Sequence, residues 1–309
     1  MSLFTRQKVL ELLAQGHVFK NGELSSIDLS RAEIDGAQFP HAYLRGANLA
    51  QISARDSNFQ GAALMFVSMN GGNFSEADLR GAQLNSAQLQ GANLVNVQAK
   101  KACFYNTDLT HCEAVQGDFS EADFREARML KANFGGVNLT RSHLGAANCT
   151  GSNFAQAQAR GASLEGADLT QTQWQGANLE QTNLCRARLF ESNLQDADLV
   201  GANLRAGTVT QANFERADLT EANLSKVQFN QVNLAEASLV SSNLQGAFFT
   251  ATDLRGTDFR DAILENTVWK DMVFVDCDVT GAVFTNAIGL TADHCDWLRN
   301  HGALNVTSS

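Results

Sequence analysis

The feature that most constrains this chain is an apolar residue that returns at every fifth position. In residues 78–96, DLRGAQLNSAQLQGANLVN, the repeat places Leu79, Leu84, Leu89 and Leu94 five apart. Five steps along an α-helix leave successive side chains about 140° apart, and an odd step along a strand moves them to opposite faces. The backbone must therefore turn a corner every five residues. A chain that turns the same way at each corner stacks its coils into a solenoid.

The same register runs from Leu24 to Phe284 without a slip. Apart from the indoles of Trp174 and Trp269, no residue at these positions has a charged or polar hydrogen-bonding side chain. The residue two before each of them is nearly always small. Alternation along an extended side then places both residues in the core, with the residue between them facing outward.

The last two residues of each five form the predicted corner. A type II turn favours Pro at its first central position and Gly at its second, where φ is positive. Pro40, the only proline, occupies the first position, and a series of glycines from Gly36 to Gly281 occupies the second. The sequence therefore predicts one such turn for every five residues.

Runs such as GANLRAG, EADLRGAQL and EANLSKVQF resemble the pentapeptide-repeat proteins, whose motif is Ala, then Asp or Asn, then Leu and two variable residues. The resemblance covers roughly residues 22 to 288. It implies the all-β fold of that family, a right-handed quadrilateral parallel β-helix with twenty residues per coil. The residues also support four sides rather than three, because asparagines recur at multiples of twenty and could stack as a ladder: Asn73, Asn93, Asn133, Asn153, Asn193, Asn213 and Asn233.

We expect a single elongated domain of about thirteen coils, because a repeat array is exempt from the usual limits on domain length. The expected parts are a capping helix in residues 1–18, the β-helix in residues 19–288, and a helix with a tail in residues 289–309. Thr5 and Gly16 are typical bounds of the first helix, and Thr291 and Gly302 of the second. Such helices would cover the exposed strand edges at the two ends. The first helix could alternatively bind a partner.

The amino terminus shows neither a secretion signal nor an 18-residue apolar run. We therefore expect a cytoplasmic protein that does not enter a membrane. The six cysteines have no CxxC spacing, and the register turns Cys112, Cys149 and Cys277 inward. We interpret them as packed, reduced thiols.

The sequence contains no nucleotide-binding, HExxH or GxSxG motif. His294, Cys295 and His301 lie close in sequence but lack zinc-site spacing and a fourth ligand. The outward acids are expected on a convex surface without a cleft that could enclose a substrate. We therefore expect no catalytic residues, no cofactor and no metal, and predict a non-catalytic scaffold or adaptor that binds other proteins.

The last coils change character, because outward positions that are Asp or Asn elsewhere become apolar. With twenty residues per coil, these side chains stack into patches and predict a homodimer interface. The resemblance points the same way, since several members of the family dimerise through their carboxy-terminal coils. Trp297 lies in the second helix, which could cover part of this surface. The candidate interface comprises Phe248, Ile263, Val268, Val273, Val283 and Trp297.

A column of acids forms a second candidate surface. It comprises Asp78, Asp118, Asp198, Asp218, Asp258 and Asp278. The family includes proteins that imitate DNA and bind DNA gyrase, so the resemblance implies an alternative function as a DNA mimic acting on such an enzyme. Arg80 and Arg260 lie near the column, and acids about 4.8 Å apart are sparser than duplex charges about 1.7 Å apart. The scaffold is therefore favoured, and direct binding of nucleic acid is not expected.

A third candidate lies where the repeat consensus thins, at Lys100, Lys101, Tyr105 and His111. Cations beside an aromatic ring could bind an acidic or phosphorylated partner. The alternative, which we favour, is a local repacking in which Ala99 and Ala114 offset larger neighbours in the core.

Overall fold

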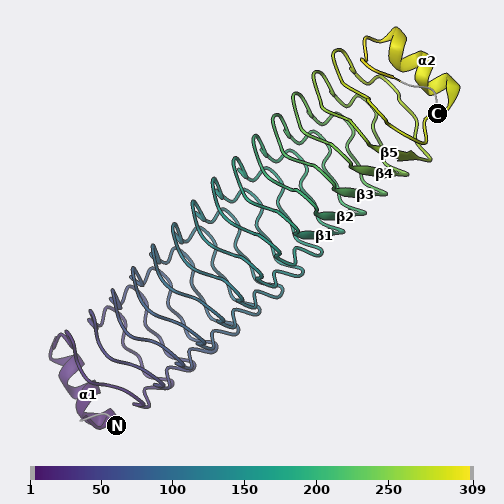
Figure 1. Ribbon diagram of the computed structural model, residues 1–309. Coiled ribbons are helices and arrows are strands. Elements are labelled where there is room, and N and C mark those ends of the chain that lie inside the picture. Colours follow the sequence, from purple (N-terminus) through teal and green to yellow (C-terminus); the bar gives the residue numbers. More distant parts are fainter. Residues whose placement is uncertain (1–3, 307–309) are drawn as a thin grey trace. The chain divides into compact units, whose positions relative to one another are not determined.

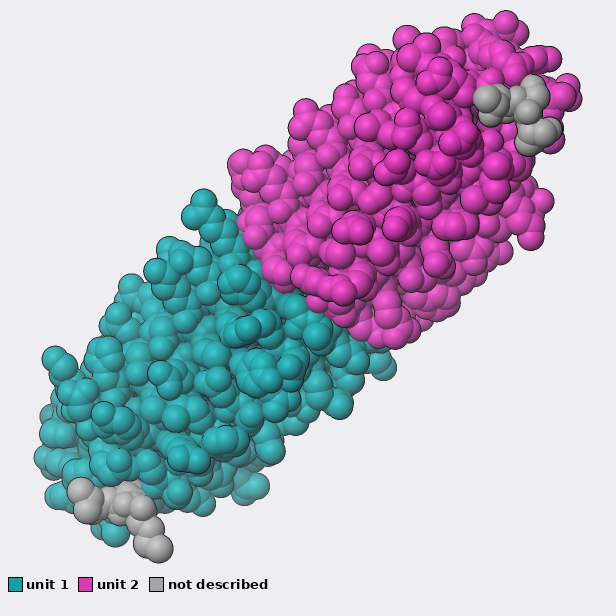
Figure 2. Space-filling view, viewed as in Figure 1, with its two compact units in different colours: residues 1–158 teal, residues 159–309 magenta. Residues whose placement is uncertain are grey.

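The computed structural model describes residues 4–306 and divides the chain into two compact units, residues 1–158 and residues 159–309 (Figures 1 and 2). Each unit is a stack of coils with the same construction. The single-domain organisation expected from the unbroken register stays a prediction.

Parallel pairing at an interval of twenty residues defines the coil in both units. In unit 1, Glu23 pairs with Tyr43 and Asn73 with Asn93, and in unit 2 Asn183 pairs with Asn203. A residue with positive φ recurs every five residues, which gives each coil four corners. The predicted four-sided parallel solenoid with twenty residues per coil is therefore confirmed.

One side of unit 2 is regular enough to form a continuous sheet. Its strands follow one another in the order β1-β2-β3-β4-β5, and every neighbouring pair is parallel with a register of twenty residues. Each strand has three residues, of which the middle one is buried. The strands are β1 (Arg188–Phe190), β2 (Thr208–Thr210), β3 (Gln228–Asn230), β4 (Phe248–Thr250) and β5 (Val268–Lys270).

The corners have the predicted turn. The N–H of Ile27 donates to the carbonyl of Leu24 at 3.1 Å, and between them Ser26 has a φ of 60°. Positive φ at the second central residue alone is the pattern of a type II turn. The N–H of that residue donates to the next coil, as from Gly81 to the Lys100 carbonyl at 2.9 Å. This bond helps to hold non-glycine residues in a conformation that otherwise costs about 1–2 kcal/mol.

The core contains every fifth residue, as predicted, and no such residue from Leu24 to Phe284 is more than 8% exposed. Aromatic rings stack from coil to coil, with Phe249 lying 4.3 Å from Trp269 between ring centroids. The indole N–H of Trp269 donates to Thr267 Oγ1 at 2.8 Å, and that of Trp174 to Thr172 Oγ1 at 3.1 Å. The polar atoms that the two indoles bring into the core are therefore paired.

The outward Asp or Asn of each repeat has a structural role at the corner that follows it. Its Oδ1 accepts the backbone N–H two residues later, as Asn213 does from Glu215 at 3.1 Å and Asp218 from Thr220 at 2.9 Å. Both residue types carry this acceptor, so either suits the corner. The aspartates at these positions therefore stabilise the corner as hydrogen-bond acceptors, a role that does not require their charge.

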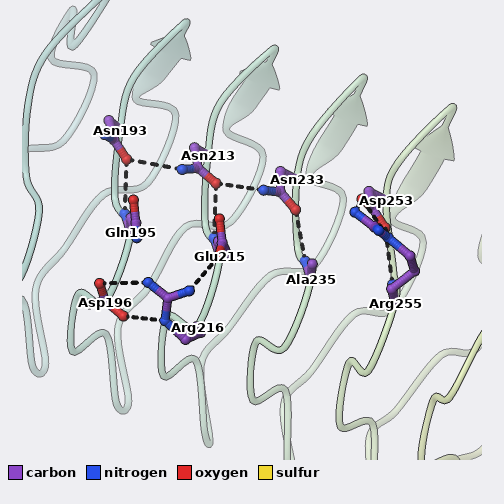
Figure 3. Close-up of polar contacts among 10 residues, drawn as sticks. All are labelled: Asn193, Gln195, Asp196, Asn213, Glu215, Arg216, Asn233, Ala235, Asp253 and Arg255. Atoms are coloured by element: carbon purple, nitrogen blue, oxygen red, sulfur yellow. Dashed lines mark hydrogen bonds and ion pairs between the residues drawn. The ribbon is translucent and has the colours of Figure 1, made fainter.

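An asparagine ladder connects three coils of unit 2 (Figure 3). The Nδ2 group of Asn213 donates to Asn193 Oδ1 at 3.3 Å, and that of Asn233 donates to Asn213 Oδ1 at 2.9 Å. The ladder ends at Asp253, because a carboxylate has no N–H to donate, and Arg255 pairs with this acid at 2.6 Å.

Unit 1 contains a shorter ladder. The Nδ2 group of Asn153 donates to Asn133 Oδ1 at 2.9 Å. Asn73 and Asn93, which were expected in the same ladder, donate no ladder bond to each other, and their Oδ1 atoms accept the corner N–H groups of Ser75 and Val95. The predicted ladder is therefore confirmed for part of the column.

The ladder predicts where Asp and Asn stop being interchangeable. Asn213→Asp keeps the corner acceptor but loses the donor to Asn193, so we expect the free energy of unfolding to fall by about 1–2 kcal/mol. Asn223→Asp is the control, because Asn223 accepts from Ser225 at 3.1 Å and donates no ladder bond. Urea unfolding followed by circular dichroism measures both variants. Equal losses of stability would contradict a role for the ladder.

The helix α1 (Arg6–Ala14) lies at the first coil of unit 1 (Figure 1). It begins after Thr5, whose hydroxyl accepts from the N–H of Lys8 at 3.3 Å. The Arg6 guanidinium donates to the carbonyls of Asp28 at 3.2 Å and Ser30 at 2.8 Å. These carbonyls have no preceding coil to pair with, so α1 covers part of the strand edge as expected.

The helix α2 (Ala292–Asn300) lies at the last coil of unit 2 (Figure 1). Its N-cap is Thr291, as predicted, and it buries Cys295 and Leu298. After the helix, the chain returns so that Leu304 pairs in parallel with Val283. This returning segment extends one side of the solenoid beyond the regular repeats.

The cysteines have the predicted environments. All six are free, and Cys112, Cys149 and Cys277 are buried. Burial raises the pKa of Cys112, and it raises the pKa of Cys277 to about 11. Because the thiolate is the reactive form, these buried thiols are inert packing groups.

Candidate protein-binding surface

Two consecutive sides of the last coils in unit 2 are apolar on the outside. Phe248 pairs with Val268 and Val268 with Ile288 on one side. On the preceding side, Ile263 pairs with Val283 and Val283 with Leu304. Four of these side chains are 41–52% exposed: Phe248, Ile263, Ile288 and Leu304. We call the two columns together the carboxy-terminal apolar surface, which comprises Phe248, Val268, Ile288, Ile263, Val283 and Leu304.

The corner between these two sides is almost free of charge. Its residues in successive coils are Gln245 and Gly246, Glu265 and Asn266, and Thr285 and Asn286, followed by Asn305 after α2. Asn286 donates to Asn266 at 3.3 Å, and Asn305 donates to Thr285 at 3.2 Å. Glu265 is therefore the one formal charge along this described stretch of the corner.

The structure places the other two predicted interface residues differently. Val273 is 65% exposed and lies on the side that follows Val268, near the exposed Val275. Trp297 is half-buried, and its ring stacks on Phe274 at 5.7 Å. Val273 therefore adjoins the carboxy-terminal apolar surface, whereas Trp297 belongs to the packing of α2.

Sequence reasoning missed Ile288 and Leu304. Ile288 is twenty residues after Val268, so continuing the column by one more coil would have included it. Leu304 follows α2 and leaves the five-residue register, and its pairing with Val283 depends on the return of the chain. The sequence carries no comparable signal for it.

The acidic column is divided between the two units. In unit 1, Asp78 and Asp118 accept the N–H groups of Arg80 and Ser120, both at 3.0 Å. Arg80 also binds Asp78 through its side chain at 2.6 Å. Burial raises the pKa of Asp78, but the hydrogen bonds from Arg80 outweigh it and hold this pKa below its usual range.

In unit 2, the acids of the column make the same corner bonds. Asp198 accepts from Val200 at 3.1 Å, and the other three accept from the residues two positions later. Arg260 lies between Asp258 and Asp278, at 2.6 Å from one carboxylate and 3.7 Å from the other. Three acids of the column therefore form ion pairs with arginine, and all six accept a backbone N–H at the corner, which an asparagine can do as well.

The four residues of the predicted cationic and aromatic site are not brought together. Lys100 and Lys101 lie at one corner, Tyr105 at the next and His111 at the one after that. Both lysines pair with Glu121, at 3.1 and 3.4 Å. The Tyr105 hydroxyl donates to Glu126 at 2.8 Å, and this bond raises the pKa of Tyr105.

His294, Cys295 and His301 have structural roles at α2. The Nδ1 atom of His294 lies 3.4 Å from the N–H of Thr291 in the capping box, and Cys295 is buried. His301 stacks on Trp297 at 4.1 Å. Within residues 4–306, no three His, Cys, Asp or Glu side chains gather as a metal site, and no helix is long and apolar enough to cross a membrane.

Two family models match most of the chain. The model described as "Pentapeptide repeat region" matches residues 167–244. The model described as "Pentapeptide repeats (8 copies)" matches residues 18–51, 57–96, 102–141, 138–173, 233–271 and 252–288. No curated protein sequence matches the chain.

Several solved structures resemble the chain at low identity. HetL from Nostoc sp. strain PCC 7120, a pentapeptide repeat protein involved in heterocyst differentiation regulation, is 20% identical over 91% of this chain and 97% of HetL, with a TM-score of 0.27. Trypsin-treated QnrB1, a plasmid-mediated fluoroquinolone resistance protein, is 18% identical over 72% of this chain and 93% of QnrB1, with a TM-score of 0.29. Rfr23 from Cyanothece 51142 is 22% identical over 38% of this chain and 90% of Rfr23, with a TM-score of 0.22. These likenesses concern the fold alone.

Proposed function

The chain belongs to the pentapeptide-repeat family, and from this premise we propose that it is a non-catalytic scaffold that binds protein and self-associates through the carboxy-terminal apolar surface. The single observation that carries the proposal is the change of the outward residues on two consecutive sides. In the preceding coils of unit 2 the outward positions of these two sides are polar, and many are an Asp or Asn that bonds to the corner, whereas Phe248, Ile263 and Ile288 lack this acceptor and leave large apolar side chains exposed. Contiguous exposed apolar surface is typical of protein interaction sites.

A second copy of the chain is the partner that this surface fits best. The chain has a formal net charge of −10, so two copies repel each other on average. A two-fold dimer places the same patch on both partners, and an apolar patch can face itself without repulsion. Depletion of charge at the centre is also the usual composition of such interfaces. With Glu265 as its one charge, the corner between the two apolar sides meets this condition.

The DNA-mimic alternative has less support. The corner bonds account for the acids of the column without a ligand, and Arg80 and Arg260 pair with three of them. Where acids occupy successive coils, as at Asp198 and Asp218, the spacing of about 4.8 Å remains wider than that of duplex charges. We therefore do not propose DNA gyrase as a target.

Light scattering after size-exclusion chromatography tests self-association directly. We expect a dimer at tens of micromolar chain, and a monomer for the double variant Phe248→Asp/Ile263→Asp. Each substitution would place a carboxylate in an apolar interface, where it would lose its water without gaining a partner, so we expect the dissociation constant to rise about thirtyfold or more.

Gln228→Asp/Asn243→Asp is the matched control. These residues lie one coil earlier on the same two sides, where they pair with Phe248 and Ile263. The control variant should remain dimeric, since it adds the same charges outside the apolar surface. A parent protein that elutes as a monomer at these concentrations would overturn the proposed self-association.

A further inference from the structure

One corner of unit 1 carries a groove of about 550 Å³ between His41 and Lys101. The second corner positions of four successive coils are His41, Gly61, Gly81 and Lys101, so two neighbouring coils lack a side chain there. A Cβ on Gly81 would meet no atom within 4 Å. A Cβ on Gly61 would overlap the imidazole of His41, which lies across this glycine. The groove is therefore open over Gly81 and bounded at one end by the imidazole.

Cations line the groove together with His41 and Gln60. Arg80 binds Asp78 through Nε at 2.9 Å and Nη2 at 2.6 Å, while Lys100 and Lys101 share Glu121. The three cationic side chains of the groove are therefore paired with only two carboxylates, those of Asp78 and Glu121. A guanidinium has five N–H donors and an ammonium has three, so most of these donors remain for a ligand. This local excess of positive charge occurs in a chain whose net charge is −10.

The backbone adds another donor at the same place. The N–H of Arg80 is satisfied by Asp78 Oδ1 at 3.0 Å. In the next coil, Gln98 occupies the position of that acid, and its amide donates to the Asn96 carbonyl at 3.5 Å. Within residues 4–306, the N–H of Lys100 donates to no protein acceptor. This backbone donor therefore lies at the same corner as the two lysines.

We propose that this groove binds a small phosphorylated ligand through its phosphoryl groups. Guanidinium and ammonium donors bind phosphate oxygens by charge-assisted hydrogen bonds. The corner at Gly81 is open, with the imidazole of His41 on one side and Lys101 on the other, so phosphoryl groups can lie between them. Exposed ion pairs such as those to Glu121 contribute little, so a dianion can compete for the lysines. The site lies within unit 1 and does not depend on self-association.

Calorimetric titration with pyrophosphate tests the site, with sulfate at matched ionic strength as the reference anion. Gly81→Gln should fill the groove with a neutral side chain. This chain already holds glutamine at such corners, with φ of 57° at Gln51 and 54° at Gln211, so the variant should fold. Gly91→Gln is the matched control, because Gly91 has a φ of 64° and the same open space around its Cβ position.

We expect saturable binding of pyrophosphate by the parent, with affinity at least about tenfold above that of sulfate. Gly81→Gln and Lys100→Gln/Lys101→Gln should each weaken it at least about tenfold. Gly91→Gln and Lys131→Gln/Lys226→Gln, which alter exposed corners elsewhere, should bind as the parent does. Absence of saturable binding at millimolar pyrophosphate, or equal binding by Gly81→Gln, would overturn the proposal.

A phosphoserine peptide in the same titration distinguishes the source of the phosphoryl group. Binding of pyrophosphate, with or without the peptide, supports a small-ligand site. Binding of the peptide without pyrophosphate would assign the groove to a phosphorylated protein and would reject the proposal of a small ligand.

Discussion

Leu224→Asp is expected to abolish the cooperative unfolding transition of the coils around it. Leu224 is fully buried, and its neighbours in the adjacent coils, Leu204 and Leu244, are fully buried too. The substitution removes the packing of a leucine, worth about 2–5 kcal/mol, and places a carboxylate where no donor faces it. We expect a loss of more than about 4 kcal/mol, which is a large part of the stability of an ordinary domain. Thermal unfolding followed by circular dichroism measures this loss.

The neighbouring substitution Asn223→Asp is the control for Leu224→Asp. Asn223 faces outward, and its Oδ1 accepts the N–H of Ser225 at 3.1 Å. Aspartate keeps this acceptor, so a carboxylate one residue away should change stability by less than about 0.5 kcal/mol. Similar losses in both variants would mean that the inward and outward positions are assigned incorrectly.

The contrast between these neighbours explains why the fold could be predicted from the sequence. If the register shifted by one residue, the side chain of Asn223 would point into the core and that of Leu224 into solvent. The apolar spacing is therefore compatible with one register only. The length of the coil was visible in the asparagines at intervals of twenty, and Asn193, Asn213 and Asn233 do form a ladder. The apolar residue at every fifth position and the asparagines at intervals of twenty, each repeated many times, therefore determine the architecture.

The candidate surfaces could be predicted less fully, because they depend on which coils lie next to each other. Phe248 and Ile263 broke the outward pattern and were found, whereas Leu304 pairs with Val283 only after the chain returns from α2. Lys101 and His111 are close in sequence but lie two corners apart. The groove instead brings together corner residues that are twenty or more positions apart, so proximity in the sequence was a poor guide to it.

Gly289→Ala is expected to detach the carboxy-terminal cap from the last coils of unit 2. Gly289 has a φ of 83°, and a Cβ there would overlap the backbone carbonyl oxygen of Trp269. The neighbouring coil and not a flexible side chain occupies this space, so the backbone itself would have to move. The steric overlap, at about 1–3 kcal/mol, adds to a left-handed strain of about 1–2 kcal/mol. We expect a loss of about 3 kcal/mol in the stability of this region.

The expected signature is local, because α2 buries Leu298 and its Trp297 stacks on Phe274. Release of the helix should shift tryptophan fluorescence to longer wavelength and expose the carboxy-terminal segment to limited proteolysis. Gly91→Ala is the control, since Gly91 has a φ of 64° with no atom within 4 Å of its Cβ position, and only the backbone strain remains. Its loss should therefore be about 1–2 kcal/mol, with unchanged cleavage near α2. If Gly289→Ala behaved like this control, the close approach of Gly289 to Trp269 would not be what holds the cap.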